Sequence, residues 1–194
     1  MRTASIIINF IIFFSTFGIL VYYFRKDGRW DVKHGLGAFR YFTVLSNVLC
    51  AVSALAMAVC QLRGGVPRGV LIFKYLGTLT VTVTMLTVLF FLGPTQGYAT
   101  MLKNDNFYMH LIGPLLAIVS FCFLEKGDFT LPTALLGLVP VLLYGAVYLY
   151  KVLYAPEDRR WEDFYGFNAN GKWPVMFSIM MLGTVIACFL LWLI

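Results

Sequence analysis

The hydrophobic residues of this chain fall into six long runs, separated by short stretches rich in charged residues, glycine and proline. A bilayer core about 30 Å thick takes about 20 helical residues to cross, which matches the length of these runs. Within each run the apolar residues are continuous rather than alternating, which favours helices over the strands of a membrane barrel. The pattern therefore predicts an all-α, polytopic membrane protein whose core is a bundle of six transmembrane helices. The expected helices cover residues 5–24, 39–62, 69–92, 106–124, 131–154 and 174–194.

The connecting segments are too short to hold a separate soluble domain, so we expect one integral membrane domain over residues 1–194. Any chemistry must then lie within the bundle or at its edges. Composition supports this interpretation, because 60% of the residues are hydrophobic and only 12% are charged, about half the charged share of a soluble domain. The surroundings of such a chain are membrane lipids.

The formal net charge is +6, but the basic residues lie at the edges of the apolar runs rather than in one patch. We therefore expect no nucleic-acid partner. The four cysteines all lie inside apolar runs, without paired spacing and without the neighbouring histidines that a zinc site needs. Neither a disulfide framework nor a metal site is indicated, and no cofactor is expected.

The distribution of Lys and Arg residues predicts the orientation in the membrane. Ten of the fifteen lie in or beside the loops that follow the first, third and fifth helices, and five lie on the opposite side. Loops rich in Lys and Arg remain in the cytoplasm as a rule. We therefore expect these three odd-numbered loops to be cytoplasmic and both chain termini to be outside.

Polar residues inside an apolar run cost free energy in a bilayer and are functional candidates for that reason. The second run opens with a polar stripe, because Thr43, Ser46, Asn47 and Cys50 fall within an arc of about 100° on a helix. An asparagine at such a depth needs a partner across the bundle or a water-filled cavity, so this face should point inward. No Asp or Glu lies within any of the six runs, which argues against a proton-coupled transporter.

The fourth run contains the only histidine within an apolar run, His110. Pro114 follows four residues later, and its missing N–H should loosen the helix at the histidine. Both Thr43 and His110 lie about one turn into a helix that begins from an odd-numbered loop. They are expected at similar depth on the same side of the membrane, where they could meet.

A threonine hydroxyl and an imidazole together suit nucleophilic catalysis. The hydroxyl attacks only if a base takes its proton, and neutral imidazole has a suitable pKa. Thr43 would then be the nucleophile and His110 the general base. The negative charge that develops on an ester oxygen would be stabilised by the side chain of Asn47 or Ser46, one turn deeper.

A third group is expected to orient the imidazole, and two residues are candidates. Asn106 lies one turn before His110, and Asp163 lies in the last long loop. The sequence does not choose between them. Tyr148 of the fifth run is a further candidate for contacting a ligand.

Two short motifs, the Phe-Thr-x-x-Ser-Asn segment at residues 42–47 and the His-x-x-x-Pro segment at residues 110–114, accompany the six runs. In these features the chain resembles the androgen-induced and androgen-dependent TFPI-regulating membrane hydrolases, and more closely their six-span bacterial relatives. The resemblance implies hydrolysis of lipid esters, namely fatty acid esters of hydroxy fatty acids, with the threonine role on Thr43 and the histidine role on His110. It also implies residence in a bacterial cytoplasmic membrane.

Other functions remain open at this stage. A lipid acyltransferase would use the same pair with an alcohol in place of water, and a transporter or non-enzymatic scaffold would line a polar pathway with Thr43, Asn47 and His110. Serine and threonine in membrane helices also often bond back to their own helix. The threonines of the third run, at positions 78, 80, 82, 84 and 87, are interpreted as structural in this sense. The oligomeric state is not predicted.

Overall fold

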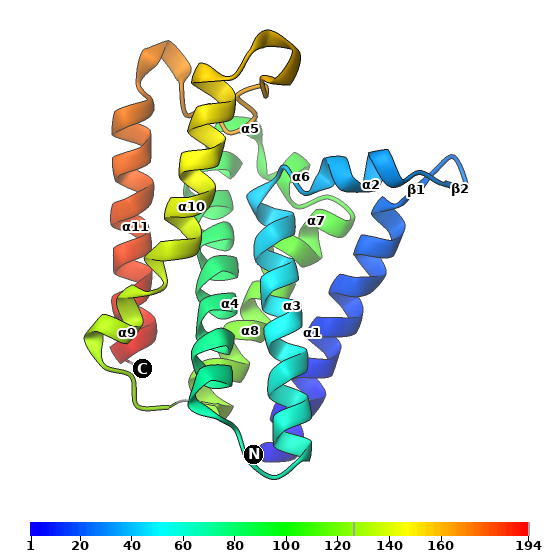
Figure 1. The fold of residues 1–194 in the computed structure, drawn as a ribbon, viewed down its shortest axis with the longest axis vertical. Coiled ribbons are helices and arrows are strands. Elements are labelled where there is room, and N and C mark those ends of the chain that lie inside the picture. Colours follow the sequence, from blue (N-terminus) through cyan, green and yellow to red (C-terminus); the bar gives the residue numbers. More distant parts are fainter. Residues whose placement is uncertain (126, 194) are drawn as a thin grey trace. The chain divides into compact units, whose positions relative to one another are not determined.

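The computed structural model of the chain describes residues 1–125 and 127–193. It is built from helices, and six of them are long and apolar enough to cross a membrane, which confirms the predicted fold class (Figure 1). The chain thus has the architecture of a multi-pass membrane protein. The six spans are Arg2–Tyr23, Phe42–Leu62, Arg68–Gln96, Asp105–Leu124, Leu131–Tyr154 and Trp173–Leu193.

The chain divides into two compact units, Met1–Phe129 and Thr130–Ile194, and each is described by itself. The first unit contains four of the spans. In order, its elements are α1 (Arg2–Tyr23), β1 (Arg25–Lys26), β2 (Arg29–Trp30), α2 (Val32–Ala38), α3 (Phe42–Leu62), α4 (Arg68–Thr87), the π-helical turn η1 (Val88–Leu92), α5 (Gly93–Gln96), α6 (Tyr98–Met101), α7 (Asp105–Phe107), the π-helical turn η2 (Tyr108–Ile112), α8 (Gly113–Val119) and the π-helical turn η3 (Ser120–Leu124).

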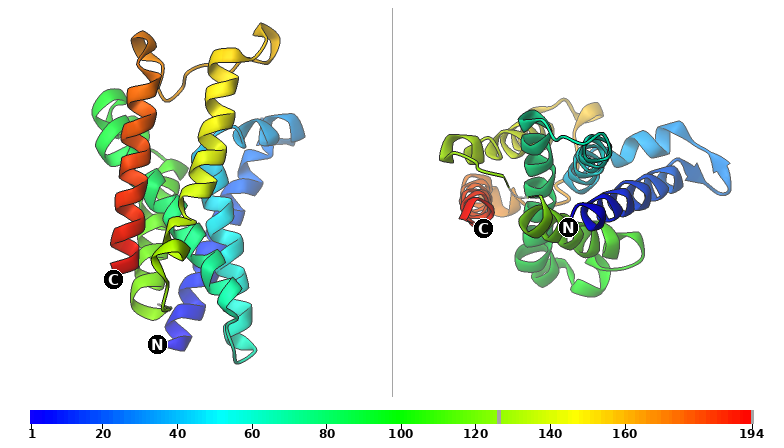
Figure 2. Two further views of the ribbon diagram at one scale, coloured as in Figure 1. Left: turned by 60° about the vertical axis from the view of Figure 1, so that its left-hand side comes forward. Right: turned by 90° about the horizontal axis from the view of Figure 1, so that it is seen from below.

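The four spans of the first unit form a closed bundle in which α1 contacts α3, α3 contacts α4, α4 contacts α8 and α8 contacts α1 (Figure 2). Helices α3 and α4 pack closely at Gly77. A Cβ atom on Gly77 of α4 would lie 2.8 Å from the Cα atom of Cys50 and 2.4 Å from the Oγ atom of Ser53. Only glycine allows the two backbones to approach this closely.

Helix α1 carries its polar residues inward and its large apolar residues outward. Ser5, Asn9 and Thr16 are buried against the bundle, whereas Ile7 and Phe14 are 54% and 62% exposed. In water this arrangement would be the reverse of a stable one. It suits a helix whose outer face meets lipid and whose polar groups find partners inside the protein.

Two Gly-Pro pairs interrupt the helices of the first unit, and each directly follows a π-helical turn. Before Pro114, the N–H of Gly113 bonds to the carbonyl of Tyr108, five residues earlier. Pro114 lacks the N–H that would bond to the carbonyl of His110, so the helix widens by one residue, as expected from its position. A Cβ atom on Gly113 would lie 3.2 Å from the Tyr108 carbonyl oxygen, which explains glycine at this position.

The second unit contains the remaining two spans. Its elements are α9 (Leu131–Leu135), α10 (Leu138–Leu149), the π-helical turn η4 (Tyr150–Tyr154), the 3₁₀ turns η5 (Glu157–Arg159) and η6 (Ala169–Gly171), and α11 (Trp173–Leu193). Helix α11 packs on α9 and α10, and the ring of Phe177 lies where a Cβ atom of Gly145 would be.

At the end of the first unit that holds the N-terminus, a lysine and a glutamate are buried together. The side chains of Lys74 and Glu125 are both 0% exposed, and Nζ lies 3.8 Å from Oε2. Lys74 also donates to Asn9 Oδ1 at 2.6 Å. Glu125 accepts from the hydroxyls of Ser5 and Ser120 at 2.5 and 2.6 Å, and from the Asn9 amide.

Glu125 lies one residue beyond the fourth span, outside every apolar run, yet its side chain turns back into the bundle and is buried. A lysine six residues inside an apolar helix requires a counter-charge, because an unpaired ion there is costly. The pair and its hydrogen-bond partners join α1, α4 and the end of η3.

We predict that Lys74→Met destabilises the protein by about 3–5 kcal/mol, because it leaves the Glu125 carboxylate buried without its partner. Adding Glu125→Gln should restore at least half of that loss, since the glutamine keeps an acceptor oxygen without the charge. Unfolding in mixed micelles, followed by circular dichroism during a denaturing-detergent titration, measures both effects. Lys172→Met, at an exposed lysine, is the control and should leave the free energy of unfolding unchanged. If Lys74→Met also left it unchanged, the role given to the pair would be contradicted.

Candidate functional site

Thr43 and His110 come together inside the first unit. Thr43 is the second residue of α3, and His110 is the central residue of η2. The Thr43 Oγ1 atom lies 3.2 Å from His110 Nε2, within hydrogen-bonding distance. Thr43 is half-buried and His110 is 7% exposed, so the pair lies just below the surface of the bundle.

The other imidazole nitrogen fixes the direction of this bond. His110 Nδ1 lies 2.6 Å from the backbone carbonyl oxygen of Met101. A carbonyl oxygen only accepts, so Nδ1 must carry the proton. In the neutral ring Nε2 then has a free lone pair, and it accepts the hydrogen of the Thr43 hydroxyl.

A short, tightly folded segment brings the Met101 carbonyl to the histidine. It consists of α5 and α6 and turns at Gly97, whose φ of +92° favours glycine. The ring of Tyr98 packs on Gly93, where a Cβ atom would lie 2.2 Å from its Cε1 atom, and its hydroxyl donates to the Leu89 carbonyl at 2.7 Å. These contacts anchor α6, and with it Met101, to the end of η1.

The base of η2 is also tied to α1. The hydroxyl of Tyr23, at the end of α1, donates to the carboxylate of Asp105 at the start of α7. The helix that carries His110 is therefore held at its start by Asp105 and, at the imidazole itself, by Met101.

The side-chain amide of Asn47 bridges the two elements of the pair. Its Nδ2 atom donates to the carbonyl of Thr43 at 2.8 Å and to the carbonyl of Met109 at 3.0 Å. Both amide hydrogens are thereby committed to backbone oxygens. Asn47 is placed to hold the start of α3 against η2.

Ser46 has partners of its own below the pair. Its hydroxyl oxygen lies 3.0 Å from the Thr43 carbonyl oxygen and 2.8 Å from the hydroxyl oxygen of Thr84 on α4. When Thr84 donates to the carbonyl of Thr80 at 3.1 Å, its oxygen accepts the Ser46 hydrogen. Ser46 thus connects α3 to α4 at the level of the site.

Thr43 differs from the threonines of α4 in the partner of its hydroxyl. Thr80, Thr82 and Thr84 each donate to a carbonyl three or four residues earlier in their own helix. Thr43 lies in the first turn of α3 and its hydroxyl meets an imidazole from another element. The back-bonding expected of membrane threonines therefore describes Thr80, Thr82 and Thr84 and does not describe Thr43. It does not describe Thr78 either, because the buried hydroxyl of Thr78 has no hydrogen-bond partner within the described residues.

The remaining three candidates have hydrogen bonds of their own. Asn106 is half-buried in α7, and its backbone N–H donates to the Lys103 carbonyl at 3.2 Å. Tyr148 and Asp163 belong to the second unit, where the tyrosine hydroxyl donates to Asp163 Oδ1 at 2.7 Å. The Asp163 carboxylate also accepts hydrogen bonds from the backbone N–H groups of Phe167 and Asn168 at 2.9 and 2.7 Å. These bonds stabilise the conformation of its own loop.

The group that orients the imidazole is thus a backbone carbonyl, which sequence analysis did not single out. Every residue type has the same backbone carbonyl, so the identity of Met101 does not predict this contact.

Within the described residues, no group of three or more His, Cys, Asp or Glu side chains could hold a metal ion. No protein-family model matches the chain, and no curated protein or solved structure matches it either.

The Met101 bond predicts the tautomer of His110. In a His34→Gln variant, which leaves His110 as the single histidine, ¹⁵N NMR of labelled imidazole should show a protonated Nδ1 and an unprotonated Nε2 at neutral pH. The reason is that Nδ1 faces an oxygen that only accepts. A ring protonated at Nε2 alone would contradict the geometry.

Proposed function

We propose that the chain is an intramembrane, threonine-dependent hydrolase of lipid esters, with Thr43 as nucleophile and His110 as general base. The observation that carries this proposal is the 3.2 Å contact between Oγ1 and Nε2, combined with the Met101 bond that leaves Nε2 unprotonated. A hydroxyl beside a free imidazole lone pair is the arrangement that activates an oxygen nucleophile.

In the first half of the proposed reaction, His110 Nε2 takes the Thr43 proton as Oγ1 attacks the ester carbonyl carbon. The tetrahedral intermediate then collapses and its C–O bond breaks. The leaving alcohol receives the proton from Nε2, and the acyl group remains on Thr43.

In the second half, water replaces the alcohol. His110 Nε2 removes a proton from the water as its oxygen attacks the acyl carbon, and the proton then returns to Thr43 Oγ1 as the fatty acid leaves. An alcohol in place of water would make the same pair an acyltransferase, so product analysis separates these two activities.

The developing oxyanion requires donors, and the first turn of α3 offers them. The backbone N–H of Thr43 belongs to the N-terminal turn of a helix, where N–H groups have no carbonyl of their own helix to bond with. The helix dipole also favours negative charge there. We assign the oxyanion to this N–H, with Asn47 as the positioning residue that holds the turn in place.

The substrate class follows from the surroundings and from the resemblance noted above. The site lies in a chain whose helices are long and apolar enough to cross a bilayer, so a substrate with long acyl chains reaches it through lipid. The resemblance to the androgen-induced and androgen-dependent TFPI-regulating hydrolases points to fatty acid esters of hydroxy fatty acids. We further propose a bacterial cytoplasmic membrane as the location, with the odd-numbered loops in the cytoplasm.

A fluorophosphonate probe tests the nucleophile directly. The wild-type chain should be labelled, and Thr43→Ala should lose the label because the phosphorus bonds to Oγ1. Thr43→Ser should keep it, and His110→Gln should slow labelling by about 100-fold or more, the usual contribution of a general base. In-gel fluorescence against time measures all four rates.

Thr82→Ala is the matched control, because Thr82 is a buried threonine that bonds to its own helix. Its labelling rate should equal that of the wild type. Labelling that survives Thr43→Ala would reject the assigned nucleophile, and a His110→Gln variant as fast as wild type would reject the assigned base.

A further inference from the structure

The segment between the first two spans forms a distinct surface element, which we call the hairpin–α2 surface (residues 25–38). Its two-residue strands pair antiparallel, with Arg25 opposite Trp30 and Lys26 opposite Arg29. Helix α2 follows and lies across the direction of α1 and α3 rather than along it (Figure 1). Because α1 ends and α3 begins at this level, a helix lying across them runs along the membrane surface.

Packing against α1 holds α2 in a defined orientation. The ring of Phe24, just after α1, lies where a Cβ atom of Gly35 would be, at 2.4 Å. With Gly35 against Phe24, the side chains of Val32 and Leu36 are left 61% and 59% exposed. Trp30 is 63% exposed as well, so three large apolar side chains of one short segment are uncovered.

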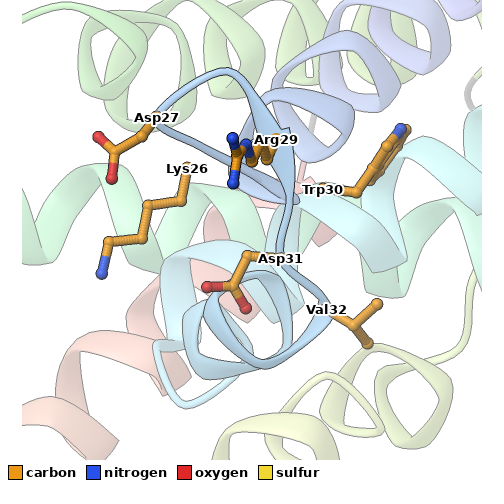
Figure 3. A pocket seen from close by; sticks show the side chains of 6 residues that line it. All are labelled: Lys26, Asp27, Arg29, Trp30, Asp31 and Val32. Carbon is orange, nitrogen blue, oxygen red and sulfur yellow. The ribbon is translucent and has the colours of Figure 1, made fainter.

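The polar groups of this element point another way. In Figure 3 the side chains of Trp30 and Val32 extend to one side of the hairpin, and those of Lys26, Asp27 and Asp31 extend to the other. These residues and Arg29 line a shallow, open hollow. The element is therefore amphipathic, like the surface helices that lie in the boundary between head groups and acyl chains.

The charge on this surface is positive. Arg25, Lys26, Arg29 and Lys33 are all exposed, and within residues 1–125 and 127–193 none of them forms an ion pair. The carboxylate of Asp31 is engaged by the backbone N–H of His34 at 2.9 Å, where it caps α2. The guanidinium carbon of Arg25 lies 5.9 Å from the centre of the Trp30 ring, so the cation lies beside the indole in a cation–π contact.

We propose that the hairpin–α2 surface binds anionic phospholipid head groups. Trp30, Val32 and Leu36 enter the edge of the acyl layer, and the guanidinium and ammonium groups of the hairpin contact lipid phosphates. An anionic lipid satisfies both faces of the element at once, since its acyl chains cover the apolar side chains and its phosphate neutralises the cations. The surface leads into α3 only a few residues before Thr43, and it holds lipid at the end of the unit where the Thr43–His110 pair lies.

Trp30 itself reports the composition of the surrounding lipid. A Trp161→Phe, Trp173→Phe, Trp192→Phe variant leaves Trp30 as the only tryptophan of the full chain. In nanodiscs, brominated phosphatidylglycerol should quench its fluorescence more strongly than brominated phosphatidylcholine at the same mole fraction. We expect a local enrichment of about fivefold for the anionic lipid, which falls as salt is raised.

Neutralising the hairpin in the same background, by Arg25→Gln, Lys26→Gln and Arg29→Gln, should make the two lipids quench equally. The double variant Arg63→Gln, Arg68→Gln is the matched control and should keep the preference, since these exposed arginines lie at the end of α3 and the start of α4. Equal quenching before neutralisation would overturn the proposal. No quenching by either lipid would also overturn it.

A second readout uses the chain with all four tryptophans in place. Head-group analysis of phospholipid that co-purifies in mild detergent should show a lower ratio of phosphatidylglycerol to phosphatidylcholine for the neutralised hairpin than for the wild type. An unchanged ratio would contradict the proposal. Neither experiment depends on ester hydrolysis, so failure of one proposal is distinguishable from failure of the other.

Discussion

The hydrogen bond between His110 Nδ1 and the Met101 carbonyl decides what the Thr43–His110 contact can do. If Nδ1 were the bare nitrogen, Nε2 would carry the proton and the threonine hydroxyl would face a donor. With the proton held on Nδ1 at 2.6 Å from a carbonyl, the lone pair of Nε2 faces Oγ1. The proposed roles of His110 and Thr43 and the order of proton transfers all depend on this tautomer. The turn at Gly97 and the packing of Tyr98 on Gly93 hold the Met101 carbonyl in the position that fixes it.

The same constraint operates through the rest of the first unit. Polar groups inside a bundle of apolar helices have no water to bond with, so each is stable only when the protein supplies its partner. At one end Lys74 is matched by Glu125 and Asn9, and at the other Asn47 gives both amide hydrogens to carbonyls. These fixed polar contacts orient α1, α3, α4 and η2 relative to one another, whereas packing of apolar side chains alone would allow them to slide.

Much of this arrangement is predictable from the sequence. The six helices follow from the lengths of the apolar runs, and a loosened helix at His110 follows from Pro114, although its π-helical form was not predicted. The shared depth of Thr43 and His110 follows from counting residues from the loops. Helix α3 begins at Phe42 rather than at residue 39 because residues 39–41 form the turn that leaves α2, and an apolar run does not distinguish a turn of Phe and Tyr from a first helical turn.

Two features escaped prediction for physical reasons. A backbone carbonyl such as that of Met101 is present at every residue, so only the fold of the loop selects it. Glu125 follows the last apolar residue of its run and by hydropathy belongs to the loop. Lys74 lies six residues inside an apolar run, which indicates that an acidic side chain is buried beside it. The sequence does not show which acidic residue this is.

The proposed mechanism requires that Thr43 becomes acylated, and mapping of the acyl group detects this step. The reconstituted chain would be mixed briefly with an activated fatty acyl ester, quenched in acid, digested and analysed by tandem mass spectrometry. We expect one acylated peptide, modified at Thr43, which accumulates in the wild type and is absent from His110→Gln over the same interval. An acyl group on another residue, or turnover in the wild type with no acylated Thr43 at any time, would contradict it.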